Sequence, residues 1–379
     1  MKNSIYFNKA ITVGNELSNI KKLENIGNFS SNGYFTNLCS KWLIKNIGCQ
    51  EALMVHSCTA ALEMCAILIN IKPKDEIIMP SYTFVSTANA FVLRGGIPVF
   101  VDIDPQTLNL DPRKIEKLIT KKTRAIVAVH YAGVSCDMDP ILKIAKKNRL
   151  YVIEDAAQAL LSSYKGKPLG SIGDLATLSF HQSKNIHCGE GGALLINNKK
   201  FIKRSKNIRD KGTNRDNFNK NIIKRYTWVD LGSSYGLSEI NASFLYAQLL
   251  KAKFIINDRL KIWNRYNNLF LKLEKDKKIF RPQIPSYTKS NAHIYYIIVK
   301  KKIREKLIKY LKSQNIIAYF HYVPLHSSFF FRKYFKKKIN LTNTNYISKS
   351  LIRLPLYQNL YFKQQKRIQK KIFFFLNKN

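Results

Sequence analysis

Between residues 53 and 196 the chain alternates short apolar runs with segments of helical period, and this alternation limits the possible folds more than any other feature. Such alternation is typical of a parallel, doubly wound α/β sheet. In sheets of this kind ligands bind at the carboxyl ends of the strands. The expected strands are Leu53–Val55, Glu76–Met79, Pro98–Val101, Ala125–Val129, Tyr151–Ile153, Leu175–Phe180 and Ala193–Ile196.

Helix start signals lie between these apolar runs. Ser57 is a favourable N-cap for a helix that continues to about Asn70, and Asp111 followed by Pro112 is a second start signal. Residues 37–45 have helical apolar spacing, whereas residues 33–36 are expected to be a loop. The polar stretch 210–235 is expected to be irregular, and a loop of that length in a compact domain usually carries function.

The remainder of the chain predicts a second, smaller α+β domain. We place the large domain at residues 1–257 and the small domain at residues 258–379. The small domain is expected to contain a strand at 293–299, a helix at 304–312 and an exposed loop at 321–326. A closing amphipathic helix is expected from Phe362.

The composition excludes some classes of protein and leaves two explanations for the charge. The net charge is +40, which is compatible with binding to nucleic acid or with compositional drift. Compositional drift toward AT-rich codons is favoured, because the lysines are spread along the chain and Asn, Ile, Phe and Tyr are also abundant. The amino terminus has no signal-peptide pattern, no run of eighteen apolar residues occurs, and the cysteines form no CxxC pair. We therefore expect a cytoplasmic protein with reduced thiols, no metal site, no membrane insertion and no nucleic-acid partner.

One asymmetry in charge bears on the substrate. No Asp or Glu follows Glu305. If this region borders the active site, it would attract an anionic substrate such as a nucleotide sugar.

A set of residues at predicted strand ends matches the needs of a pyridoxal phosphate enzyme. Such an enzyme needs a lysine for the cofactor aldehyde, a carboxylate at the pyridine nitrogen, phosphate ligands and a flat side chain over the ring. Each candidate also has an ordinary structural explanation, and their joint occurrence favours a site. The candidates are Lys184 for the aldehyde, Asp155 for the nitrogen, Gln158 for the phenolic oxygen, Thr59, Ala60 and Ser179 for the phosphate, and Phe84 or Tyr82 for stacking.

Four motifs resemble those of the DegT/DnrJ/StrS-type sugar aminotransferases. They are His56-Ser-Cys-Thr-Ala-Ala-Leu62, Pro80-Ser-Tyr-Thr-Phe84, Glu154-Asp-Ala-Ala-Gln158 and Ser179-Phe-His-Gln-Ser-Lys184. The resemblance extends from about residue 8 to about residue 360. It implies the fold type I architecture of pyridoxal phosphate enzymes and the same cofactor roles for these residues. It also implies a homodimer with active sites shared between subunits.

Three further stretches resemble family members that move an amino group from L-glutamate to C4 of dTDP-4-keto-6-deoxyglucose. They are Tyr82–Arg94, Lys211–Arg215 and Tyr226–Tyr235. Some relatives place an asparagine after the position of Tyr235, directed at the neighbouring subunit's phosphate, where this chain has Gly236. Candidate substrate contacts are His181, Lys211, Arg215, His321 and His326.

Other activities remain open at this point. The amino group could go to C3 or to another sugar, and the scaffold could serve a basic regulatory or nucleic-acid-binding protein. Related sugar dehydratases carry histidine in place of Lys184, so the lysine favours transamination.

Overall fold

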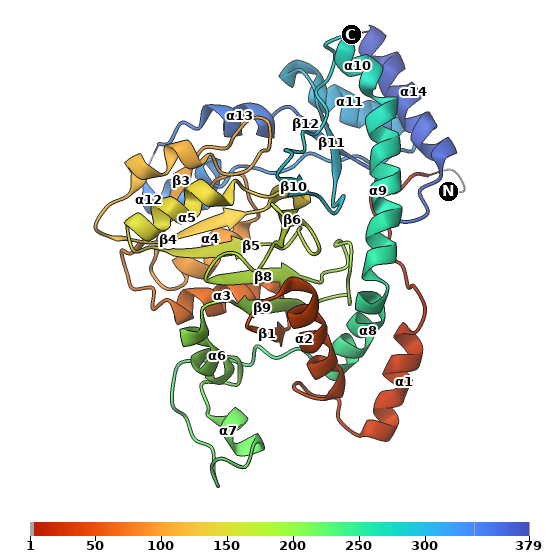
Figure 1. Ribbon diagram of the computed structural model, residues 1–379. Coiled ribbons are helices and arrows are strands. Elements are labelled where there is room, and N and C mark those ends of the chain that lie inside the picture. Colours follow the sequence, from red (N-terminus) through yellow and green to blue (C-terminus); the bar gives the residue numbers. More distant parts are fainter. Residues whose placement is uncertain (1–3, 337, 379) are drawn as a thin grey trace.

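A computed structural model describes residues 4–336 and 338–378 (Figure 1). A seven-stranded sheet in the order β1-β9-β8-β5-β4-β2-β3 forms its centre. All strands run parallel except β9, which is antiparallel to both β1 and β8. The strands are β1 (Glu51–Val55), β2 (Glu76–Pro80), β3 (Ile97–Val101), β4 (Thr123–Val129), β5 (Tyr151–Asp155), β8 (Leu175–Ser179) and β9 (Gly192–Ile196). The predicted doubly wound, mostly parallel sheet is confirmed.

Helices cover both faces of the sheet because both faces of its strands are apolar. In β1, Ala52 and Met54 join the core on one face, while Leu53 and Val55 join the core on the other. The first face carries α2 (Tyr34–Ile47), α5 (Met138–Lys147) and α8 (Glu239–Leu250), with α1 (Glu16–Ile26) packed on α8. The second face carries α3 (Cys58–Leu68), α4 (Val85–Val92) and α6 (Ile202–Arg209).

The C-terminal part is built around a two-stranded antiparallel sheet and a third core. Helix α9 crosses residue 257 without a break, so the proposed division between the domains falls inside a helix. The elements of this part are α9 (Ala252–Leu269), α10 (Leu271–Lys275), β11 (Tyr295–Ile298), α11 (Lys301–Ser313), β12 (Leu351–Leu354) and α14 (Phe362–Lys378). A separate small sheet pairs β6 (Ser163–Tyr164) with β7 (Lys167–Pro168) and β10 (Thr288–Lys289).

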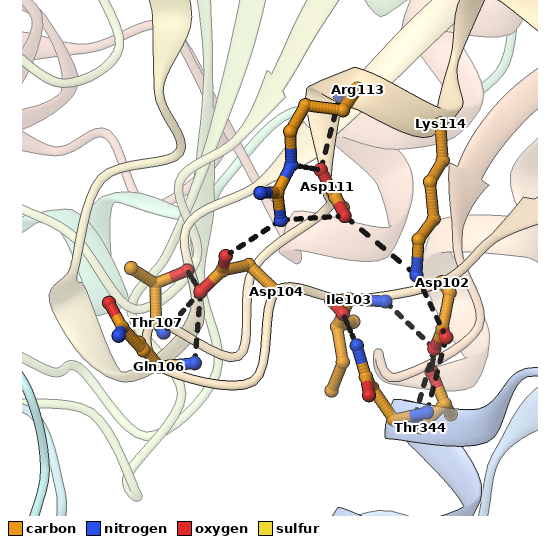
Figure 2. Close-up of polar contacts among 10 residues, drawn as sticks. Asp102, Ile103, Asp104, Gln106, Thr107, Asp111, Arg113, Lys114 and Thr344 are labelled. Carbon is orange, nitrogen blue, oxygen red and sulfur yellow. Dashed lines mark hydrogen bonds and ion pairs between the residues drawn. The ribbon is translucent and has the colours of Figure 1, made fainter.

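Two further helices of the C-terminal part pack on the large sheet domain. Helix α12 (Phe329–Phe335) places Phe331 in the second-face core, 4.9 Å from Phe100 between ring centroids. The first turn of helix α13 (Thr342–Ser348) contacts Asp102, whose carboxylate accepts hydrogen bonds from the Thr344 amide and hydroxyl (Figure 2). Residues of both parts of the chain line one shared cavity.

Three local expectations differ from the structure. Residues 34–36 belong to the first turn of α2 instead of a loop, because the buried Glu239 accepts from the amides of Gly33, Phe35 and Thr36. The irregular stretch contains a short helix, α7 (Arg215–Asn219). The loop at 321–326 is not exposed at its two histidines, which are 8% and 5% exposed.

Within the described ranges, no helix is both long enough and apolar enough to cross a membrane.

Candidate active site

A cavity of about 690 Å³ lies at the carboxyl ends of β5 and β8 and at the first turn of α3. This position agrees with the rule for open α/β sheets, in which loops after the strands shape the ligand site. The cavity brings together most of the predicted residues, namely Thr59, Phe84, Asp155, Gln158, Ser179, His181, Lys184 and His321.

Lys184 extends into this cavity from the turn that follows β8. Its amide donates to the His181 carbonyl oxygen at 2.9 Å, which closes the turn. Burial lowers the pKa of the Lys184 amine, and the nearby charge of Asp155 only partly offsets this effect. In the described part of the chain Lys184 has no ion-pair partner. A lysine with a lowered pKa is more often neutral near pH 7 and can attack an aldehyde.

Asp155 ends β5 and is 6% exposed. Its Oδ2 accepts from Thr87 Oγ1 at 2.7 Å, and its Oδ1 accepts from the Ala157 amide at 3.2 Å. Thr87 in turn contacts Thr83 Oγ1 at 2.8 Å. These donors are neutral, and Asp155 forms no ion pair with any described residue, so its negative charge remains available to a protonated ring nitrogen.

The first turn of α3 offers a place for a phosphate. Ser57 caps this helix, and its Oγ accepts the Ala60 amide at 3.0 Å. A Cβ on Gly192 would lie 2.4 Å from the Ser57 carbonyl carbon and 2.5 Å from the Cys58 nitrogen, so only glycine lets β9 approach this turn so closely. Thr59 lines the cavity and bonds to Ser86 Oγ at 2.8 Å.

Ala60, the other predicted phosphate residue, does not line the cavity. Its amide is engaged by the Ser57 cap described above. Thr59 and Ser179 line the cavity beside the N-terminus of α3, and a phosphate contact from either of them or from the Ala60 amide stays a prediction.

Gln158 and Phe84 both line the cavity. Gln158 Oε1 accepts the Ala132 amide at 2.7 Å, and its Nε2 donates to the Tyr322 hydroxyl at 2.9 Å. These bonds hold the side-chain amide at the wall of the cavity. The Phe84 ring is 59% exposed and also lines the cavity. Its stacking on a ligand ring stays a prediction.

The predicted substrate residues separate into two groups. His181 lies at the cavity, 2.8 Å from Ser183 Oγ and 3.5 Å from a Glu190 oxygen. His321 also lines the cavity, bonds to Tyr131 through Nδ1 at 3.0 Å, and has a pKa held well below its usual range by burial.

His326, Lys211 and Arg215 do not reach the cavity within one chain. His326 is buried between Ser81 Oγ at 2.7 Å and Asn345 Oδ1 at 3.1 Å, where it links the C-terminal part to the sheet domain. Lys211 and Arg215 belong to the segment around α7 that projects away from the body (Figure 1).

Several cavity residues carried no recognised motif in the sequence. Phe7, Arg259, His293, Tyr322 and Arg353 all line it, and all but Phe7 come from the C-terminal part. The one sequence signal among them is Arg353, a charged residue inside the apolar strand Leu351–Leu354.

Comparison with known proteins identifies the relatives of this chain. The model of the DegT/DnrJ/EryC1/StrS aminotransferase family matches residues 11–373. The chain is 40% identical over 323 residues to the uncharacterised protein MJ1066 of Methanocaldococcus jannaschii, covering 83% of each chain. It is 33% identical to the spore coat polysaccharide biosynthesis protein SpsC of Bacillus subtilis, covering 83% of this chain and 82% of the relative.

Solved structures agree in fold. The aminotransferase PseC of Helicobacter pylori, involved in the biosynthesis of pseudoaminic acid, has a TM-score of 0.91 at 26% identity and covers 100% of both chains. NtdA of Bacillus subtilis, solved with bound cofactor PMP, has a TM-score of 0.87 at 25% identity and covers 100% of this chain and 87% of its own. The cofactor of this chain is pyridoxal phosphate, and the residues around Lys184 fit it.

Proposed function

Because the chain belongs to the DegT/DnrJ/EryC1/StrS aminotransferase family, we propose that this sugar aminotransferase is a dTDP-4-amino-4,6-dideoxygalactose transaminase. It moves the amino group of L-glutamate to C4 of dTDP-4-keto-6-deoxyglucose in the cytoplasm. The product serves the synthesis of a surface polysaccharide of the enterobacterial common antigen type.

The observation that carries the proposal is the meeting of Lys184 and Asp155 in one cavity. A degenerate scaffold with a purely regulatory role would have no need for a lysine and a carboxylate placed in this way. A histidine at position 184 would have favoured the sugar dehydratases. The intact pair favours transamination.

Each of the predicted residues in the cavity has a separate proposed role in the reaction. Thr59 and Ser179 bind the phosphate, and Asp155 holds a proton on the ring nitrogen. Lys184 Nζ would hold the cofactor, and its free amine would accept and return the proton of the amino donor's Cα. When bound, the cofactor supplies an electron sink. Phe84 covers the ring and excludes water from one face.

The finer assignment of the substrate has separate support. SpsC is named for polysaccharide biosynthesis and PseC for the biosynthesis of pseudoaminic acid, so both point to a sugar. The choice of C4 and of the dTDP-linked hexose rests on the resemblance of Tyr82–Arg94, Lys211–Arg215 and Tyr226–Tyr235. Transfer to C3, or to another nucleotide sugar, is the alternative.

We also propose a homodimer whose active sites are shared between subunits. Apolar side chains are exposed at the two ends of α4, at Val85 and Leu93, and on the projecting segment, at Ile222 and Trp228. A partner that covers these side chains would also bring Lys211 and Arg215 near a cavity. Gly236 cannot be replaced by asparagine without movement, since its Cβ would lie 2.6 Å from Ser31.

The first experiment tests the enzyme itself. Purified protein given pyridoxal phosphate should develop the visible absorption band of a lysine-bound cofactor, and Lys184→Ala should abolish both the band and transamination. An exposed lysine such as Lys117 is the matched control, and Lys117→Ala should retain both. The absence of a band in the wild-type protein would refute the proposal.

The second experiment tests the substrate. The protein is supplied with L-glutamate and a set of dTDP-keto sugars, and the position of the new amino group is assigned by NMR. A 4-amino product with the galacto configuration is expected. A 3-amino product would favour the alternative.

A further inference from the structure

The first turn of α4 contacts three parts of the predicted cofactor site. Phe84, the candidate for stacking, is the N-cap of this helix and lines the cavity. Ser86 Oγ lies 2.8 Å from Thr59 Oγ1, and Thr87 Oγ1 donates to Asp155 Oδ2 at 2.7 Å. One turn of helix therefore connects the stacking ring, a candidate phosphate ligand and the carboxylate expected at the ring nitrogen.

The direction of the Thr87 bond follows from the chemistry of its partner. An ionised carboxylate can only accept a hydrogen bond, so the hydroxyl proton of Thr87 points at Asp155. Thr87 Oγ1 is then an acceptor for Thr83 Oγ1, which lies 2.8 Å away. Thr83 and Thr87 are 2% and 1% exposed. The two threonines therefore form a buried chain of hydroxyls that ends on the carboxylate.

Asp155 has few donors for a buried carboxylate. Besides Thr87, the described residues give its side chain one hydrogen bond, from the Ala157 amide at 3.2 Å. Glu154, the preceding residue of β5, accepts from three backbone amides and from His130. The Ala157 bond is at the long end of the usual range, so Thr87 is the main donor to Asp155.

This donor decides where a shared proton lies. A carboxylate that faces a pyridine nitrogen shares one proton with it, and the proton lies either on the ring or on the carboxylate. Hydrogen bonds to the ionised carboxylate favour the first arrangement, because they stabilise the anion. Without them, the proton moves to the carboxylate and leaves a neutral acid beside a neutral ring. The ring is a strong electron sink only while it carries the proton.

We propose that Thr87 is a positioning residue that keeps the Asp155 carboxylate ionised and directed at the bound cofactor, so that the shared proton stays on the ring nitrogen. This inference rests on the role proposed above for Asp155 and adds the residue that maintains it. A threonine that served only the packing of α4 would be replaceable by valine, which has nearly the same size and shape.

The test uses a ligand that cannot react with Lys184. This ligand, 4-deoxypyridoxine 5′-phosphate, has the ring and the phosphate of the cofactor but no aldehyde. With an isotope label on its ring nitrogen, NMR at neutral pH reports whether the bound nitrogen carries a proton, and calorimetry gives the affinity. Thr87→Val removes the hydroxyl, Thr87→Ser keeps it, and Asp155→Asn removes the negative charge.

Thr344 provides a matched control outside the cavity. It is also a buried threonine whose hydroxyl donates to an aspartate, since Thr344 Oγ1 lies 2.8 Å from Asp102 Oδ1 (Figure 2). Thr344→Val removes the same kind of bond. It should lower the thermal stability without changing either property of the bound ligand.

Thr87→Val should move the nitrogen resonance toward that of the unprotonated ring and weaken binding at least about tenfold, because a bond to a charged group is lost. Asp155→Asn should have a larger effect in the same direction. Thr87→Ser and Thr344→Val should keep the wild-type resonance and affinity. Thermal unfolding identifies the folded variants, and Thr87→Ala replaces Thr87→Val if the valine variant does not fold.

A protonated ring and wild-type affinity in the folded variant without the Thr87 hydroxyl would overturn the inference. A shifted resonance in Thr344→Val or Thr87→Ser would also overturn it, since the effect would not depend on this hydroxyl. In these cases, loss of the proton in Asp155→Asn would still support the role of Asp155. An unprotonated ring in the wild-type protein would instead refute that role, and this inference with it.

Discussion

At Lys184 one amine has to react near neutral pH, where an ordinary lysine carries a proton. Burial of Lys184 in the cavity lowers the pKa of its amine from the ordinary value of 10.5. Lowering the pKa increases the neutral fraction at pH 7 to 9. The neutral fraction then falls as the pH drops through the lowered pKa.

This predicts how the capture of the cofactor depends on pH. The second-order rate of pyridoxal phosphate binding, followed by stopped-flow absorbance, should level off below pH 10.5 and fall as the pH drops through the lowered pKa. Nα-acetyl-lysine amide is the comparison and should keep rising to higher pH. A wild-type rate that rises in parallel with this free amine would contradict the environment described for Lys184.

At the same scale, sequence and structure agree where a residue belongs to a motif on a strand end. Lys184, Asp155 and Ser179 were predicted because each lies at or just after the end of an apolar run, and the structure brings them into one cavity. Phe7 and Arg353 were not predicted, because they are 346 positions apart and meet only through tertiary packing. His326 was wrongly expected on an exposed loop, since nothing in its local sequence shows that Ser81 and Asn345 enclose it.

Among the elements, α13 depends on a capping carboxylate from a distant strand. Asp102 follows β3 and accepts from the amides of Asn343 and Thr344 at 3.1 and 2.9 Å, and from Lys114 Nζ at 3.2 Å (Figure 2). Burial alone would raise the pKa of Asp102, but these hydrogen bonds from Thr344 and Asn343 outweigh it and lower the pKa. The bonds attach the C-terminal part to the edge of the large sheet.

Asp102→Asn should lower the free energy of unfolding by about 2 kcal/mol at pH 7, because it removes charge-assisted bonds to a helix N-terminus. A carboxyl with a lowered pKa stabilises the fold above its ordinary value of 3.8 and loses this contribution as the pH falls through the folded-state value. The difference between variant and wild type should therefore shrink below about pH 4. Urea unfolding measures the free energy of unfolding at pH 7 and its change at lower pH. Asp276→Asn, at an exposed position, is the control.

The order of strands and helices was predicted from periodicity because strand and helix patterns are local. The antiparallel direction of β9 was not predicted, since an apolar run does not encode its direction. The first turn of α2 was also missed, because its capping group is not part of the local sequence. Its capping group, Glu239, comes from the start of α8, about 200 residues later in the chain.

For the whole molecule, the net charge of +40 predicts a positive field that would attract an anionic substrate. An anionic nucleotide sugar should be captured faster at low ionic strength. We expect kcat/KM for the sugar nucleotide to fall about fivefold as the salt rises from about 20 mM to about 200 mM, with little change in kcat. Unchanged capture across this range would show that the charge has no role in binding.

The proposed dimer makes a second prediction at this scale. Trp228 is 77% exposed on the projecting segment, so Trp228→Asp should convert a dimer into a monomer. Phe374 is 50% exposed on α14, at the opposite end of the molecule (Figure 1), and Phe374→Asp should leave the dimer intact. Light scattering after size-exclusion chromatography measures the mass. A wild-type monomer would exclude the shared active site.

The amino-terminal segment has a practical consequence for work with this enzyme. Ile5 is held by backbone bonds to Asn315 and Ile317, and two positions later Phe7 packs on Arg353. A purification tag at the amino-terminal end would therefore sit a few residues from the cavity, which Phe7 lines. Tagged and untagged preparations could then differ in their measured rates. A tag at the carboxyl end, beyond α14, is the safer choice for kinetics.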